Sequence, residues 1–204
     1  MRELVIVGAG GFARETASAV RDMAEWKLLG FLDDVKTGPS ILGPLSLAWE
    51  LPGVDFVVCV GSPRDYGVRE RLAKRVPQRF ATIVHPSVYI GQGCTVGEGS
   101  VLLPGVTLTA EVTVGAHVAV MPQVVLTHDD VVGDFVTIAS GVRLGGSVQV
   151  GRGAYLGAGA LVRESVRIGE GSLIGMGSVV LRDVPAGEIW VGNPARYLKG
   201  SGQA

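Results

Sequence analysis

The sequence predicts two joined parts, a short parallel α/β unit and, after it, a long parallel β-coil built from six-residue repeats. Three observations predict this fold: an aliphatic residue returns at every sixth position over half of the chain, glycine is frequent, and a strand, a glycine turn and a helix open the sequence. Of 204 residues, 31 are glycine, while 47% are hydrophobic and only 6% aromatic. This composition is too apolar for a disordered chain and fits an ordered core of aliphatic side chains.

The six-residue series begins at Val84 and reaches Val180 without interruption, and all 17 of its positions are aliphatic. Its period fits neither an α-helix nor a sheet of hairpins, but a short strand followed by a tight turn. Three repeats close one triangular coil of about 18 residues, and stacked coils pair as parallel strands about 4.8 Å apart. We expect the series inside the coil, with a small residue or valine packed beside each member. The glycine that often follows each aliphatic residue suits a turn where a Cβ would clash or φ is positive.

The first third of the chain predicts a parallel βαβαβ unit. Strands are expected at 4–7, 28–32 and 54–60, with helices at 14–23 and from about 64 to 76.

A glycine motif follows the first predicted strand. Gly8, Gly10 and Ala13 fit G-x-G-x-x-G/A, and the acidic pair Asp33 and Asp34 lies about 20 residues later. Backbone N–H groups at a helix N-terminus bind phosphate, and a carboxylate accepts ribose hydroxyls. A dinucleotide needs two such halves, and only one fits before the coils. We therefore expect a pocket for a mononucleotide such as a nucleotide sugar, rather than for NAD; a tight turn that binds nothing is the alternative.

The least regular repeat contains His128, followed by Asp129 and Asp130. Asp130 occupies a position that is small or apolar in most other repeats, and a histidine beside carboxylates is held in one tautomer and made more basic. One coil further on, Gly146 leaves a backbone N–H open to an oxyanion. The sequence therefore predicts a base and an oxyanion donor side by side, against the alternative of a surface histidine with acidic neighbours.

The other histidines and the cysteines carry weaker signals. His85 is expected at the entry to the coils, and His117 is expected to face solvent or another subunit. Cys59 and Cys94 are expected as buried free thiols of a cytosolic protein. A zinc site of three histidines is an alternative, but His85 and His128 are more than two coils apart, so we expect no metal.

The formal net charge is −1, which argues against nucleic acid as a partner. No apolar run approaches the ~20 residues of a membrane span, and no signal peptide is evident. We expect a cytoplasmic protein without a membrane partner.

The hexapeptide series resembles the left-handed parallel β-helix of the hexapeptide-repeat acyltransferases, and the left hand is inferred from that resemblance alone. With the segments 8–12, 31–34, 60–63, 127–129 and 191–196 added, the whole chain resembles the bacterial nucleotide-sugar N-acetyltransferases of the PglD/NeuD-like group.

The resemblance implies a Rossmann-like nucleotide-sugar-binding domain at 1–82, a left-handed β-helix with the acetyl-CoA and catalytic site at 83–185, and a C-terminal tail at 186–204. It implies a homotrimer with active sites between subunits. Such an enzyme transfers acetyl from acetyl-CoA to the amino group of a deoxy-amino-sugar linked to UDP, GDP or dTDP. Acetylation of oxygen on a free sugar acid such as sialate, and a non-catalytic nucleotide-binding scaffold, remain alternatives.

The resemblance also implies roles for individual residues. His128 is the general base and Asp129 raises its basicity, beside the oxyanion donor that the repeat spacing predicts at Gly146. The residues expected to bind the nucleotide sugar are Gly10, Gly11, Phe12, Asp33, Asp34 and Gly61. Those expected to bind acetyl-CoA are Thr137, Gly146, Ala158 and Met176. Thr137 replaces a second histidine of some members, so it can donate a hydrogen bond but carry no charge.

Overall fold

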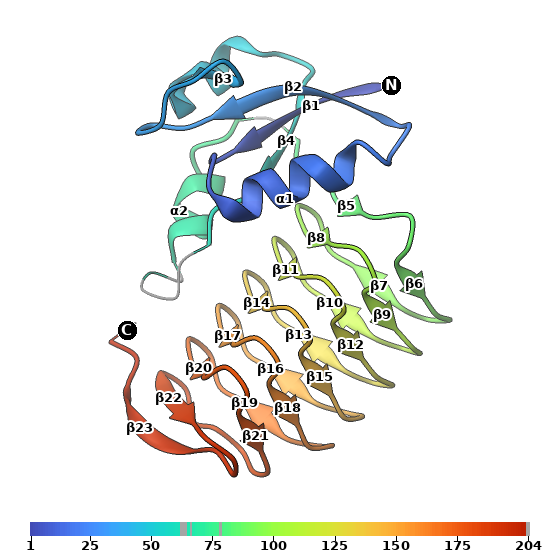
Figure 1. The fold of residues 1–204 in the computed structure, drawn as a ribbon, viewed down its shortest axis with the longest axis vertical. Coiled ribbons are helices and arrows are strands. Elements are labelled where there is room, and N and C mark those ends of the chain that lie inside the picture. The colour runs from blue at the N-terminus through green and yellow to red at the C-terminus, as the bar shows by residue number, and fades with distance from the viewer. Residues whose placement is uncertain (62–64, 66, 78, 203–204) are drawn as a thin grey trace.

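The computed structural model describes residues 1–202 except 62–64, 66 and 78. Its N-terminal part is a parallel sheet in the strand order β3–β2–β1–β4 (Figure 1). Its strands and helices are β1 (Arg2–Val7), α1 (Gly11–Val20), β2 (Trp26–Leu32), β3 (Ile41–Gly43), the 3₁₀ helix η1 (Leu45–Glu50), β4 (Asp55–Val58) and α2 (Val68–Ala73).

The predicted βαβαβ order is present, with two additions and shifted ends. The helix predicted at 14–23 begins at Gly11, because the glycine motif itself forms the N-terminus and Gly10 is the N-cap. β3 and η1 were not predicted, since neither is long enough to show a period. The helix predicted from residue 64 is described from Val68 on, and residues 62–64 lie outside the described part.

From Ile83 on, two-residue strands recur every six residues and stack into three parallel sheets. The β5 face contains β5 (Ile83–Val84), β8 (Val101–Leu102), β11 (Ala119–Val120), β14 (Thr137–Ile138), β17 (Tyr155–Leu156) and β20 (Leu173–Ile174). The β6 face contains β6 (Tyr89–Ile90), β9 (Thr107–Leu108), β12 (Val125–Leu126), β15 (Arg143–Leu144), β18 (Leu161–Val162) and β21 (Val179–Val180). The β7 face contains β7 (Thr95–Val96), β10 (Thr113–Val114), β13 (Val131–Val132), β16 (Gln149–Val150) and β19 (Arg167–Ile168).

The aliphatic series forms the core of this solenoid, as its period predicts. Each member pairs with the member 18 residues on, as Val120 does with Ile138. All members from Leu102 onward are at most 4% exposed. The three members of the first coil are less buried, because no coil lies below them: Val84 and Val96 are half-buried, and Ile90 is 42% exposed.

Close approach and positive φ occur at two different positions of the repeat. The glycine directly after the aliphatic residue lies against the next coil, so that a Cβ added to Gly145 would come 2.6 Å from the Glu164 nitrogen. The residue with a positive φ comes two positions after that glycine position, as at Asp129 with a φ of 63°. The turn that contains His128 therefore has a fixed left-handed bend directly after the histidine.

The C-terminal segment adds two strands to the β5 face. β22 (Glu188–Val191) runs parallel to β20, and β23 (Arg196–Gly200) pairs with β22 in antiparallel fashion. Trp190 on β22 is buried against the core of the solenoid.

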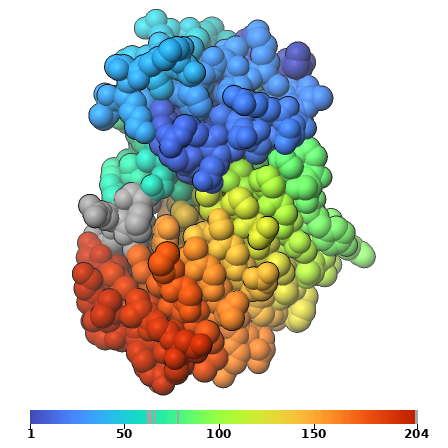
Figure 2. All heavy atoms as spheres, in the orientation of Figure 1, coloured from blue at the N-terminus to red at the C-terminus, as the bar shows by residue number. Residues whose placement is uncertain are grey.

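The N-terminal part packs on the first coils of the solenoid (Figures 1 and 2). Ala13 and Ala17 of α1 share one apolar cluster with Val101 and Leu103 of the solenoid. Within the described residues, no helix has both the length and the apolar character needed to cross a membrane.

Candidate active site

The turn with His128 joins β12 on the β6 face to β13 on the β7 face. The side chains of His128 and Asp129 are 66% and 60% exposed, and Nδ1 of the histidine lies 2.8 Å from Oδ2 of the aspartate. An ionised carboxylate only accepts hydrogen bonds, so Nδ1 carries the proton and Nε2 is left as an open proton acceptor.

Gly146 lies one coil further along the same corner, directly against the imidazole. A Cβ added to Gly146 would come 2.3 Å from both Cε1 and Nε2 of His128. Among the described residues, the Gly146 N–H has no hydrogen-bond partner. The structure thus brings His128 and Gly146 together, and only glycine leaves room for the ring in this position.

Asp130 is fully buried under this turn. Its carboxylate accepts hydrogen bonds from the backbone N–H groups of Thr127 and Val148, each at 2.8 Å. Burial raises the pKa of Asp130 to about 6, although the two hydrogen bonds act in the opposite direction.

The glycine motif leaves open space at the start of α1. A Cβ added to Gly10 or Gly11 would meet nothing within 4 Å. Asp33 accepts hydrogen bonds from three backbone N–H groups, one of them that of Ala9 at 2.8 Å. Partial burial opposes its ionisation, yet these hydrogen bonds lower the pKa of Asp33 overall. Asp34 accepts from a backbone N–H and pairs with an arginine, so both acids also shape the loops around the motif.

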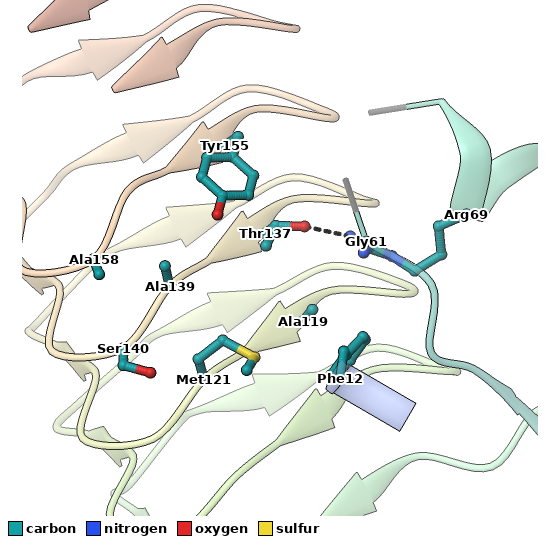
Figure 3. Close-up of a pocket in the computed structure, with 10 residues that line it drawn as sticks. All are labelled: Phe12, Gly61, Arg69, Ala119, Met121, Thr137, Ala139, Ser140, Tyr155 and Ala158. Atoms are coloured by element: carbon teal, nitrogen blue, oxygen red, sulfur yellow. Dashed lines mark hydrogen bonds between the residues drawn. The ribbon is translucent and has the colours of Figure 1, made fainter. Parts of the chain in front are cut away.

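A cavity of about 200 Å³ lies between the N-terminal part and the β5 face (Figure 3). It is lined by Phe12, Gly61, Arg69, Ala119, Met121, Thr137, Ala139, Ser140, Tyr155 and Ala158. It therefore unites two residues predicted to bind the nucleotide sugar with two predicted to bind acetyl-CoA. Met176 lies one coil beyond Ala158 and is 77% exposed, while Asp33 and Asp34 line a separate hollow.

The predicted site is divided between two corners of the solenoid. His128, Asp129 and Gly146 lie at the corner between the β6 and β7 faces. Ala158 and Met176 lie at the corner between the β5 and β6 faces, beside the cavity. One chain therefore does not bring all of these residues together.

Arg69 is a residue of the cavity that the sequence reasoning missed. It is 3% exposed, yet its guanidinium reaches from α2 to the solenoid and donates to the carbonyl oxygens of His117 and Phe135 at 2.8 and 2.6 Å. It also donates to Oγ1 of Thr137 at 3.0 Å, the dashed line of Figure 3. Burial lowers its pKa to about 10, so it remains charged at neutral pH. Because Thr137 accepts here and its hydroxyl hydrogen has no acceptor among the described residues, that hydrogen can donate to another group.

Two expectations about side chains are wrong. His117 does not face solvent: its ring is half-buried between Phe80 and Phe135, at 4.6 and 4.9 Å between centroids, because the N-terminal part packs on this corner. Burial accordingly lowers the pKa of His117. Cys94 is only half-buried, because it lies in the open first coil, whereas Cys59 is buried as expected. Within the described ranges, no three His, Cys, Asp or Glu side chains gather where they could hold a metal ion.

Comparison with known proteins matches both parts of the chain. Residues 3–76 match the PglD N-terminal domain. Residues 87–122 match the hexapeptide repeat of succinyl-transferase, and residues 147–182 match the bacterial transferase hexapeptide of six repeats.

A curated relative is the UDP-N-acetylbacillosamine N-acetyltransferase of Bacillus subtilis. It is 32% identical over 115 residues, which cover 50% of this chain and 52% of that protein, so the match spans about half the length of the relative.

Two solved structures are similar over nearly their whole length. The acetyltransferase domain of PglB from Neisseria gonorrhoeae in complex with acetyl coenzyme A is 26% identical, with a TM-score of 0.91, over 97% of this chain and 99% of that one. PerB from Caulobacter crescentus in complex with CoA and GDP-perosamine is 26% identical, with a TM-score of 0.88, over 97% and 98%. The perosamine N-acetyltransferase of that organism has also been solved with one histidine replaced by asparagine.

An α/β unit on a β-solenoid, with the matches to both parts, defines a hexapeptide-repeat protein of the bacterial transferase type. Within that class, the chain is similar to the PglD-like proteins, through its N-terminal domain and through its likeness to PglB and PerB.

Proposed function

We propose that this protein transfers an acetyl group from acetyl-CoA to the amino group of a sugar linked to a nucleotide. The observation that carries the proposal is the contact between His128 and Gly146. It sets an open imidazole nitrogen beside a backbone N–H that has no partner among the described residues. The proposed substrates follow the ligands of the similar structures, since one is solved with acetyl coenzyme A and another with CoA and GDP-perosamine.

The chemistry that these residues support is general-base-assisted attack of an amine on a thioester. The lone pair of the sugar nitrogen forms a bond to the thioester carbon while Nε2 of His128 accepts the proton of the amine. Asp129 holds the ring through Nδ1 and stabilises the positive charge that the ring gains. The Gly146 N–H donates to the oxygen that becomes negative. The carbon–sulfur bond then breaks, and the sulfur leaves as the CoA thiol with the proton that Nε2 of His128 took from the amine.

The two substrates fit different elements of the chain. The open space at Gly10 and Gly11, at the N-terminus of α1, suits the phosphates of a nucleotide. Ala158 and Met176 present backbone N–H groups that have no hydrogen-bond partner within the described residues, which suits the amide carbonyl oxygens along CoA. Thr137, whose hydroxyl hydrogen has no acceptor in the described part of the chain, lies between these two sites in the cavity.

A second copy of the chain completes this site. The outward side chains of the β6 face include Tyr89 and Leu161, 61% and 43% exposed, together with the half-buried Val125 and Val179. The β7 face presents one large exposed apolar residue, Val131. If three β6 faces meet around an axis, the His128 corner of one copy lies beside the cavity corner of the next. We therefore include a homotrimer in the proposal.

Light scattering on the purified protein measures its mass in solution, and we expect about three times the 21.2 kDa of one chain. The variant Leu161→Glu places a charge on the β6 face and is expected to lower the measured mass, whereas Thr113→Glu on the β7 face leaves it unchanged. If the wild-type protein is a monomer, the proposal that a second copy completes the site is wrong.

The function itself is tested by release of the CoA thiol from acetyl-CoA with a panel of acceptors. The panel holds amino-sugars linked to UDP, GDP and dTDP, the same sugars without the nucleotide, and free sialate. We expect turnover with at least one nucleotide-linked amino-sugar and none with its free sugar. Turnover with sialate alone would establish O-acetylation instead. Nucleotide binding without any binding of acetyl-CoA would establish a scaffold.

A further inference from the structure

Asp130 occupies a position of the repeat where an acid serves no packing purpose. In the other repeats the same position, four residues after the buried aliphatic residue, holds valine, alanine, cysteine or serine. Ser100 shows what the position requires: its hydroxyl accepts the N–H of Val118 and donates to the carbonyl of Gly115, at 2.9 and 2.8 Å. A neutral residue therefore satisfies the backbone here.

An ionised acid at this position lowers the stability of the fold. The pKa of Asp130 is raised from 3.8 to about 6, chiefly by burial. Between these values the unfolded chain has lost a proton that the folded chain still holds, so the free energy of unfolding falls as the pH rises through this window. Above pH 6 the whole of this decrease in the free energy of unfolding remains. The chain thus keeps a buried negative charge at neutral pH although serine fits the same position.

We propose that Asp130 is a positioning residue for His128, which fixes the shape of its turn and stabilises the protonated ring. The Thr127 N–H closes the turn onto one carboxylate oxygen, and the Val148 N–H of the next coil ties down the other. The imidazole thereby keeps its place over Gly146.

The effect of Asp130 on the protonated His128 ring depends on the charged groups that surround its carboxylate. The charged groups that act on Asp130 are His128, which favours its ionised form, and Asp129, which opposes it. At the same position the coils below and above present Val112 and Val148, which carry no charge. By reciprocity, the Asp130 carboxylate favours the imidazolium that forms when His128 takes a proton.

The inference rests on the proposed function, and the test uses Asp130→Ser, because this position of the repeat already holds serine in three repeats (Ser100, Ser172 and Ser178). We expect kcat at pH 7.5 to fall by about five- to tenfold, with both KM values little changed, because the lost charge acts on the reacting state. The unfolding temperature at pH 8 should not fall. Ser100→Ala, at the same position in a distant coil, is expected to leave kcat unchanged.

A second measurement needs no substrate. The NMR signals of the His128 ring, followed against pH, should change at a lower pH in Asp130→Ser than in the wild type. Unchanged ring signals and an unchanged kcat would overturn the proposal, and so would a fall in kcat matched by a lower unfolding temperature. If the wild type transfers no acetyl group at all, the proposed function fails, and the ring signals alone still decide the role of Asp130.

Discussion

His128→Ala should lower kcat by about 10²- to 10⁴-fold, which is the usual contribution of a general base. The reason is that Nε2 is the open proton acceptor beside the Gly146 N–H, while Nδ1 is taken by Asp129. The KM for acetyl-CoA should change little, since the ring acts on the amine proton rather than on the CoA chain. Steady-state assays with the best acceptor of the panel measure both quantities.

The stability of His128→Ala shows whether its lower kcat comes from the missing base or from a damaged fold. His128 is 66% exposed, so its removal should leave the unfolding temperature and the mass in solution unchanged. His85 offers a matched control: it lies in the first coil, bound to Ser87 and Asp22, and His85→Asn should keep the full kcat. A His128→Ala enzyme with near wild-type kcat would remove this residue from the mechanism.

The solenoid could be predicted because its information is local and repeated. Every coil contributes an aliphatic residue at the same position, from Leu102 to Val180, and the pairing of one coil with the next follows from the period alone. For the same reason the contact of His128 with Gly146 follows from their 18-residue separation, without knowledge of the rest of the fold.

The junction of the two parts could not be predicted, because it depends on which corner the N-terminal part covers. Arg69 reads as one more charge on a short amphipathic helix, yet it is buried and bound to carbonyl oxygens of two different coils. His117 looks like a solvent-facing turn residue until Phe80 is packed on it. Such contacts leave no periodic pattern in the sequence, because the residues that make them lie far apart in the chain.

Gly146→Ala should lower kcat by about 10²-fold while the fold stays intact, because a misplacement of about 1 Å in a reacting group has effects of that size. The added Cβ would overlap Nε2 of His128, and the exposed ring moves aside more easily than the backbone does. The backbone itself accepts alanine at this turn position, where Ala116 and Ala158 stand in other coils. Glu164→Ala, at the same corner one coil further on, is the matched control and should keep its kcat.

The double variant shows whether Gly146 acts through the base. If the Cβ harms catalysis only by displacing the imidazole, adding Gly146→Ala to His128→Ala costs nothing further, because the ring is already gone. If the loss comes from the N–H that faces the oxyanion, the two effects multiply, since base and oxyanion donor stabilise different charges. The contact at 2.3 Å favours the first outcome, with kcat of the double variant equal to that of His128→Ala. A double variant lower by a further 10²-fold, with an unchanged unfolding temperature, would assign the loss to the amide instead.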